Sequence, residues 1–291
     1  MKRSHLGLWL LPAALPLAIV TVYPIVRTLI LSVSNLSLIN GFHLEFAALA
    51  NFVRLFSDFR FLNTLITTLF FTATSVFIEF VCGFALAVVV GSLKRPTRVV
   101  RALLIVPWTL PTAIAAVLWT WLLNDQYGII NRLLMDSRLT ATPVAWLASP
   151  DTAMSALIIA DVWKTVPFVF LILLAGLRTI PADLYEAVEI DGGGFWAGLR
   201  YVTWPGVRVF IYVAVIFRVI QAFAVFDLVY VMTGGGPGGS TETVSVYAYQ
   251  TYMRYLDFGY GSAVVVASVV VLALAAGLLY LLLLRRHEDL A

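Results

Sequence analysis

Six long apolar runs, separated by short polar stretches, constrain the fold of this chain more than any other feature. They cover residues 6–33, 61–91, 100–123, 152–176, 206–232 and 258–284. Each run has the roughly 20 residues that a helix needs to cross about 30 Å of hydrocarbon. Only 12% of the residues are charged, whereas soluble domains have about 25%. The sequence therefore predicts an all-α membrane protein with six transmembrane helices.

The first apolar run, residues 6–33, follows Met-Lys-Arg at the N-terminus. A cleavable signal peptide has an apolar core of about 7–15 residues and a cleavage site with small residues. This run is longer and has no clear cleavage site. We therefore expect a retained first helix.

Lysine and arginine set the predicted orientation, because cytoplasmic loops carry an excess of them. One set of helix ends has eleven such residues and the other set has five. The eleven are Lys2, Arg3, Lys94, Arg95, Arg98, Arg101, Arg178, Arg200, Arg208, Arg285 and Arg286, and the five are Arg54, Arg60, Arg132, Arg138 and Arg254. We expect both termini and residues 183–205 to be cytoplasmic.

Residues 183–205 form a long polar interruption on this basic side. Asp183 followed by Glu186 is typical of a capping box at a helix start. Gly192–Gly194 should end that helix, because glycine tolerates backbone angles that other residues avoid. Phe195, Leu199 and Val202 then have the spacing of a second short helix. Thr203 and Pro205 are typical of the entry to the next apolar run. The stretch predicts a helix, a glycine turn and a second helix that lie against the membrane.

Several residues of this stretch resemble the EAA motif of ABC importer permeases. The matching positions are Glu186-Ala187, Gly192, Val202 and Pro205. Val188 and Trp204 depart from the usual alanine and leucine. Other matches fall in family order along nearly the whole chain, and the resemblance is strongest to permeases for sugars. They are Asn51-Phe52, Val106-Pro107-Trp108, Tyr127-Gly128 with Asn131, Trp163-Lys164 with Pro167-Phe168, and Thr233–Pro237.

The resemblance implies the architecture of a type I ABC importer permease. Residues 1–60 would be the first helix and outer loop, residues 61–284 the permease core and residues 285–291 a cytoplasmic tail. The EAA stretch would dock on a cytoplasmic ATPase, and an ordinary amphipathic interfacial loop is the alternative. The implied coupling residues are Glu186, Ala187, Asp191, Gly192, Gly193 and Pro205.

The resemblance also implies partners. They are a second permease subunit in a heterodimer, two ATPase subunits, an extracytoplasmic sugar-binding protein and membrane lipid. The chain contains no GxxxxGK[ST] motif, so we expect ATP and magnesium on the partner ATPases and no enzymatic activity here. A net charge of +3 and a single cysteine, Cys82, argue against nucleic acid binding and against a CxxC metal site.

Charged groups within the apolar runs are costly and need a partner or water. They are Arg27, Glu79, Asp161, Lys164, Arg218 and Asp227. We expect Asp161 and Lys164, three residues apart on one helix, to neutralise each other. Glu79 has no visible partner. Two interpretations stay open, namely interhelical pairing and a polar pathway for a hydroxylated solute. The pathway candidates are Asp161, Lys164, Arg218, Gln221, Phe223, Phe226 and Asp227.

The outer loops are expected at residues 34–60, 124–151 and 233–257. The last begins with the glycine-rich segment Gly234, Gly235, Gly236 and Pro237, which predicts a mobile turn rather than a phosphate cradle. An aromatic group follows, which is typical of an interfacial belt or of a surface for a sugar-carrying partner. Its members are Tyr247, Tyr249, Tyr252, Tyr255, Phe258 and Tyr260.

Two other functional classes fit the sequence less well. A secondary transporter driven by an ion gradient would have inverted repeats and would need no ATPase. A membrane enzyme would need convergent catalytic groups, but His5, His43 and His287 lie outside the runs and far apart in sequence. We therefore predict the permease subunit of an ATP-driven sugar importer. The sequence does not identify the sugar.

Overall fold

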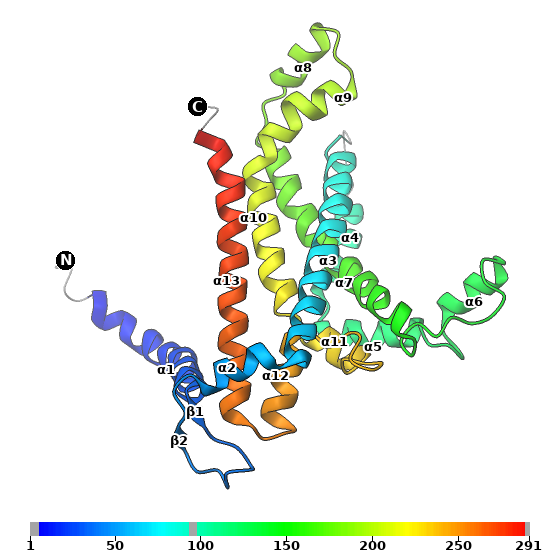
Figure 1. Cartoon of the computed structure of the whole chain (residues 1–291). Helices are drawn as coiled ribbons and strands as arrows, with labels where there is room; N and C mark the ends of the chain where they lie inside the picture. The colour runs from blue at the N-terminus through cyan, green and yellow to red at the C-terminus, as the bar shows by residue number, and fades with distance from the viewer. Residues whose placement is uncertain (1–5, 93–97, 289–291) are drawn as a thin grey trace. The chain divides into compact units, whose positions relative to one another are not determined.

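The computed structural model describes residues 6–92 and 98–288, and these residues are mostly helical. Figure 1 shows several long helices together with shorter ones. The chain divides into two compact units, residues 1–65 with 244–271 and residues 66–243 with 272–291. The all-α fold predicted from the sequence is confirmed. The predicted boundaries after residues 60 and 284 remain predictions.

Among the described residues, five helices are long and apolar enough to cross a membrane, and a bent helix pair could supply a sixth crossing. The five candidate spans are Leu15–Ser32, Phe59–Ser92, Pro150–Leu177, Phe195–Phe223 and Phe258–Leu281. Four of them match predicted runs closely, and Phe195–Phe223 overlaps the predicted run at residues 206–232 only in part. Two of the predicted runs, however, are broken.

The predicted span over residues 100–123 is not one straight helix. It is divided into α4 (Arg98–Thr109) and α5 (Thr112–Leu122), and the two described segments are bent by 100° at the break. Pro111 lies at the break and is the N-cap of α5. Proline has no N–H to donate and disfavours a helical conformation at the preceding residue. Pro111 therefore explains the break between α4 and α5.

The predicted span over residues 206–232 is also wrong in its extent. Helix α10 (Trp204–Phe223) ends well before Met232, and a separate helix, α11 (Asp227–Met232), follows. The hydroxyl of Thr243 donates a hydrogen bond to the carbonyl oxygen of Val225 in the break (3.3 Å). This bond satisfies one backbone group that the interrupted helix leaves free.

Unit 2 is built around α3, α7 and α10, whose buried side chains form one apolar cluster. Gly83 of α3 allows close approach to α7, because a Cβ there would lie 2.7 Å from Cγ1 of Val169. The helices of this unit are α3 (Phe59–Ser92) beyond its first two turns, α4, α5, α6 (Ile129–Asp136), α7 (Pro150–Leu177), α8 (Asp183–Ile190), α9 (Phe195–Gly198), the π-helical turn η2 (Leu199–Thr203), α10, α11 and the part of α13 (Phe258–Glu288) from Leu272 on.

Unit 1 combines residues 1–65 with residues 244–271. The side-chain NH₂ group of Asn51 donates hydrogen bonds to the carbonyl oxygens of Ser32 (3.1 Å) and Ser34 (2.9 Å), where the first helix ends. The elements of this unit are α1 (Leu6–Ser32), β1 (Ser34–Asn35), β2 (Glu45–Phe46), α2 (Ala50–Ser57), the start of α3, α12 (Val244–Met253) and the first part of α13 (Phe258–Glu288).

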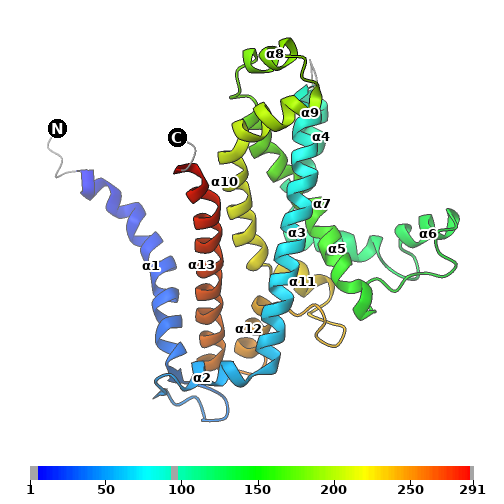
Figure 2. The ribbon, with the colours of Figure 1, turned by 45° about the horizontal axis from the view of Figure 1, so that its top comes forward.

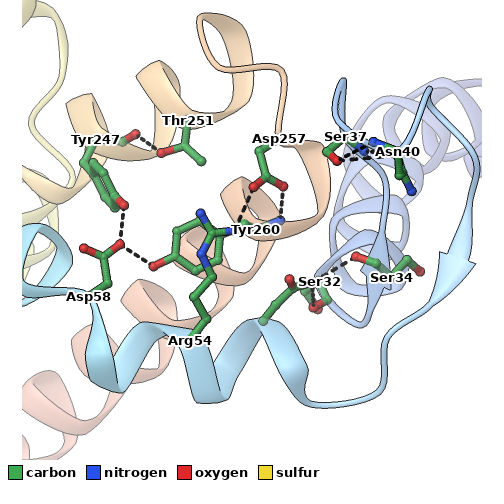
Figure 3. A network of polar contacts seen from close by, with 11 residues as sticks. Ser32, Ser34, Ser37, Asn40, Arg54, Asp58, Tyr247, Thr251, Asp257 and Tyr260 are labelled. Atoms are coloured by element: carbon green, nitrogen blue, oxygen red, sulfur yellow. Dashed lines mark hydrogen bonds and ion pairs between the residues drawn. The ribbon is translucent and has the colours of Figure 1, made fainter.

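Asp58 organises unit 1, as Figure 3 shows. One carboxylate oxygen accepts hydrogen bonds from the backbone N–H groups of Arg60 (2.9 Å) and Phe61 (3.2 Å) in the first turn of α3. The other oxygen accepts the phenol groups of Tyr247 and Tyr260, each at 2.5 Å. Asp58 therefore caps α3 and ties it to α12 and α13.

The same contacts shift two ionisation equilibria. Partial burial would raise the pKa of Asp58, but the hydrogen bonds from the two tyrosines and the backbone outweigh it, so the pKa lies below its ordinary value. Burial and the neighbouring carboxylate raise the pKa of Tyr247 to about 12.

An interfacial belt is therefore the wrong interpretation for part of the aromatic group. Tyr247 and Tyr260 are buried and bonded to Asp58. Tyr255 remains exposed. The loop predicted at residues 233–257 is also more regular than expected, since α12 lies within it.

Candidate functional site

The polar stretch Asp183–Pro205 begins with α8 (Asp183–Ile190). The predicted capping box is wrong, because the N-cap residue is Ala182 and no side chain caps the helix. Asp183 and Glu186 instead lie in the first turn. Negative charge there still favours the helix, since the helix dipole places partial positive charge at the N-terminus.

The α8 residues that resemble the family motif point outward. Glu186, Ala187 and Asp191 are all exposed, and no residue of α8 is buried. Gly192 has φ +79°, so the glycine turn is confirmed. Gly193 is hemmed in, because a Cβ there would lie 2.6 Å from Cγ1 of Val188.

The predicted second helix is not separate from the next span. Helix α9 (Phe195–Gly198) continues through the π-helical turn η2 (Leu199–Thr203) directly into α10. Figures 1 and 2 both show α8 and α9 as a bend at one end of α10. Pro205 lies in the first turn of α10, as predicted, where a missing N–H costs nothing. The C-terminal part of residues 183–205 is therefore part of the candidate membrane span Phe195–Phe223.

A buried charge cluster joins α3, α7 and α10. Arg218 donates to both carboxylate oxygens of Glu79, at 2.5 and 2.8 Å, and to Asp161 at 3.1 Å. The side chains are only 4%, 0% and 9% exposed for Arg218, Glu79 and Asp161. One guanidinium thus balances two carboxylates from two other helices, with the bidentate geometry that arginine favours.

This cluster corrects the pairing predicted from the sequence. Asp161 pairs with Arg218, and no direct ion pair with Lys164 is formed in the described part of the chain. Glu79, which had no visible partner in the sequence, is fully buried against the same guanidinium. Interhelical pairing therefore accounts for three of the charged groups. Lys164 is half-buried beside them.

The remaining pathway candidates fall into two groups. Gln221 lies at the edge of the cluster, where its carbonyl oxygen accepts a hydrogen bond from Arg218 (2.9 Å), and it is otherwise exposed. Phe223 is buried, and Phe226 stacks on Tyr230 with ring centroids 5.2 Å apart. Asp227 is exposed in the first turn of α11. The last three do not join the cluster.

An aromatic row was missed by the sequence analysis. Phe168 lies 6.0 Å from Trp108 and 6.5 Å from Phe217 between ring centroids. Trp108 and Phe217 are exposed. Phe168 follows Lys164 by four residues, and Phe217 precedes Gln221 by four, so each aromatic shares a helix face with a polar candidate. This spacing was visible in the sequence.

The glycine-rich segment Gly234–Pro237 makes several hydrogen bonds with neighbouring threonines. The hydroxyl of Thr241 donates to the carbonyl of Gly236 (2.6 Å) and lies 2.8 Å from the hydroxyl of Thr233. The backbone N–H of Gly235 in turn donates to Thr233 (3.2 Å). Gly234 and Gly235 both have positive φ. The segment forms a hydrogen-bonded turn, and its predicted mobility stays a prediction.

A family model described as "Binding-protein-dependent transport system inner membrane component" matches residues 79–288. The chain belongs to this family. It is therefore a transport subunit that crosses the membrane several times and works with a binding protein. The match includes the charge cluster and the whole of the Asp183–Pro205 stretch.

Named relatives cover most of this permease. It is 40% identical over 244 residues to the trehalose/maltose transport system permease protein MalF of Thermococcus litoralis. This match covers 84% of this chain and 81% of the relative. It is 37% identical over 284 residues to the sulfoquinovosyl glycerol transport system permease protein SmoG of Agrobacterium fabrum, with coverage of 97% and 90%.

Solved structures support the fold of the permease. A chain of a bacterial ABC transporter that imports the acidic polysaccharide alginate matches with a TM-score of 0.83, at 21% identity. The match covers 96% of this chain and 95% of that one. The predicted type I importer architecture is confirmed.

Proposed function

We propose that the permease is the membrane subunit of an ATP-driven importer for a sugar or sugar derivative. The observation that carries the proposal is its 37–40% identity, over most of its length, to permeases named for sugar transport. The exposed α8 adds a surface on which an energy-supplying partner can act. No covalent chemistry is proposed for this chain, because ATP hydrolysis is assigned to a separate ATPase.

The stretch Asp183–Pro205 is proposed as the docking site for a separate ATPase, which would carry the ATP and magnesium. The exposed carboxylates of Glu186 and Asp191 can accept charge-assisted hydrogen bonds from basic groups. This role requires both termini to be cytoplasmic. Lys2, Arg3, Lys94 and Arg95, which favour that orientation in the sequence, lie outside the described residues.

A second permease subunit is proposed as the partner within the membrane, in a heterodimer with two ATPases. Only 11% of the α1 candidate span is buried within the chain. Its exposed residues are strongly apolar, and they include Val20, Ile25 and Ile30. A surface of this kind fits lipid or another membrane helix. The outer turn at Gly234–Pro237 is proposed to face the sugar-binding protein.

The substrate pathway is proposed to pass along Lys164, Gln221 and the aromatic row. Arg218 can only donate hydrogen bonds, so the oxygen of the Gln221 amide must face it. The NH₂ group of Gln221 is then turned away from the cluster. Lys164 also has donors only, and its ammonium forms no hydrogen bond in the described part of the chain. Together they present donors to the oxygen atoms of a sugar.

The aromatic row adds apolar surface to these donors. Trp108 and Phe217 expose ring faces, and such faces can stack on the apolar side of a sugar ring. The buried Arg218, Glu79 and Asp161 hold the helices that carry these groups rather than meeting the solute. Phe223, buried in the same helix, is not proposed as a contact.

A reconstituted system tests the proposal. The permease is co-expressed with its candidate partner permease and ATPase, purified and placed in proteoliposomes with a sugar-binding protein. We expect sugar uptake to require ATP. Only ATP supplied on the side of the membrane where the ATPase lies should support it. Uptake that follows an imposed ion gradient and needs no ATPase would instead indicate a secondary transporter.

A further inference from the structure

The described structure leaves α8 with few contacts that could fix its position. No residue of α8 is buried. A cavity of about 750 Å³ is lined by residues of α8 and α9 and by the ends of α3 and α7, including Ser92 and Leu177. Where this cavity lies, α8 is therefore not closely packed against α3 and α7.

One side chain of α8 reaches the base of α10. The hydroxyl of Tyr185 lies 3.0 Å from the hydroxyl of Thr203. Thr203 is only 5% exposed. The ring of Tyr185 lies over Gly198, where a Cβ would be 3.6 Å from its Cδ1 atom. Tyr185 thus contacts α9 with its ring and η2 with its hydroxyl.

The second partner in this contact lies in an unusual backbone segment. Thr203 is the last residue of the π-helical turn Leu199–Thr203, which the N–H of Trp204 closes by donating to the carbonyl of Leu199. Single π-helical turns are rare and frequently occur at functional sites. The Tyr185–Thr203 bond therefore joins α8 to the place where α10 begins.

We propose that Tyr185 and Thr203 are positioning residues that transmit movement of α8 to α10. The proposal rests on the proposed docking of Asp183–Pro205 on an ATPase. The cavity separates α8 from the ends of α3 and α7, so movement passes first through Tyr185 to Thr203. Arg218 of α10 then carries it to α3 and α7 through Glu79 and Asp161.

The test is the number of sugar molecules imported per ATP hydrolysed by the purified, reconstituted complex. Tyr185→Phe keeps the ring but removes the hydroxyl, and Thr203→Val removes the partner hydroxyl at similar volume. Each should lower the ratio about two- to tenfold, the effect expected for one hydrogen bond. Thr203→Ser should restore it. The double variant should be no worse than either single variant.

The ratio is measured per assembled complex, so lower abundance of a variant does not affect it. Tyr280→Phe is the matched control, because Tyr280 is exposed on α13 and its hydroxyl has no hydrogen bond in the described residues. A wild-type ratio in both single variants would overturn the proposal. So would additive losses in the double variant, or a Thr203→Ser variant as poor as Thr203→Val.

Glu186→Ala separates this proposal from the one on which it rests. Normal uptake and normal copurification of the ATPase in that variant would refute docking at α8. Loss of docking in Glu186→Ala, together with a wild-type ratio in the Tyr185 and Thr203 variants, would refute only the positioning role.

Discussion

The charge cluster and α8 are the two polar elements of unit 2 that bear on transport, and they differ in where their charges find partners. Arg218, Glu79 and Asp161 are buried and satisfied by one another. Glu186 and Asp191 are exposed and have no ion pair in the described residues. A buried charge must be paired inside the chain, whereas an exposed carboxylate is available to another protein.

This difference separates two roles along α10. The cluster fixes α3, α7 and α10 to one another through residues that lie inside these helices. The α8 bend lies at the end of α10 and is left open. Changes to the cluster should therefore affect folding and abundance, and changes to α8 should affect coupling at constant abundance.

The largest effect is expected from Arg218→Met. It leaves two buried carboxylates facing each other without a countercharge, and breaking a buried pair in this way costs about 3–5 kcal/mol. Membrane abundance and thermal stability in detergent should fall sharply. Adding Glu79→Gln and Asp161→Asn to Arg218→Met should recover much of the loss. No recovery would show that the charges are not the reason.

Glu186→Ala should leave abundance unchanged and reduce uptake. A partner charge left without its carboxylate costs about 2–5 kcal/mol at an interface. Gly192→Val should act by another route, because valine disfavours the φ of +79° at this position. Uptake, abundance and ATPase copurification are measured together in both variants. A loss of abundance that matches the loss of uptake would contradict the separation.

Lys164→Met tests whether the half-buried lysine belongs to the cluster or to the pathway. Because Asp161 is paired with Arg218, abundance should stay within about twofold of wild type, unlike that of Arg218→Met. A hydrogen bond from a charged group contributes about 1.5–3 kcal/mol, so the apparent affinity for the sugar should fall about tenfold or more. Reduced abundance with unchanged affinity would place Lys164 in the cluster.

The smallest effects are expected in unit 1, where Asp58 is only partly buried. Tyr247→Phe removes one hydrogen bond and should cost about 1 kcal/mol of stability. Asp58→Asn keeps an N-cap residue for α3, but its NH₂ group cannot accept a phenol proton. Thermal unfolding of the two variants at neutral pH measures both effects. Equal stability to wild type in both would mean that the network does not hold unit 1 together.

The lowered pKa of Asp58 also predicts a pH dependence. The group binds a proton less readily in the folded chain than in the unfolded chain, so its contribution is complete above the ordinary pKa of 3.8. That contribution is lost as the pH falls through the folded-state pKa. Wild type should therefore lose more stability than Asp58→Asn between about pH 5 and pH 2.

The long helices could be predicted because each apolar run is a local property of the sequence. Runs 6–33, 61–91, 152–176 and 258–284 match α1, α3, α7 and α13 closely. The break between α4 and α5 was also local, since Pro107 and Pro111 are visible in the sequence. The end of α10 at Phe223 has no proline or glycine to signal it.

Partners distant in sequence could not be predicted in the same way. Glu79 and Arg218 are 139 residues apart, and Lys164 was a nearer candidate partner for Asp161. The pairing rule for residues three apart on one helix favoured Asp161 with Lys164. The bidentate contact between Arg218 and Glu79 instead depends on how α3 packs against α10. Asp58 and Tyr247 are 189 residues apart, and their contact was missed for the same reason.

The most direct test of the difference between the two regions is the accessibility of α8 in whole cells and inverted vesicles. Cys82 is replaced by alanine, and single cysteines are introduced as Ala187→Cys in α8 and Gln126→Cys in an outer loop. Ala187→Cys should react with a membrane-impermeant reagent only in inverted vesicles, and co-expressed ATPase should protect it, whereas Gln126→Cys should react only in whole cells. Reaction of Ala187→Cys from outside, or no protection by the ATPase, would contradict the docking role of α8.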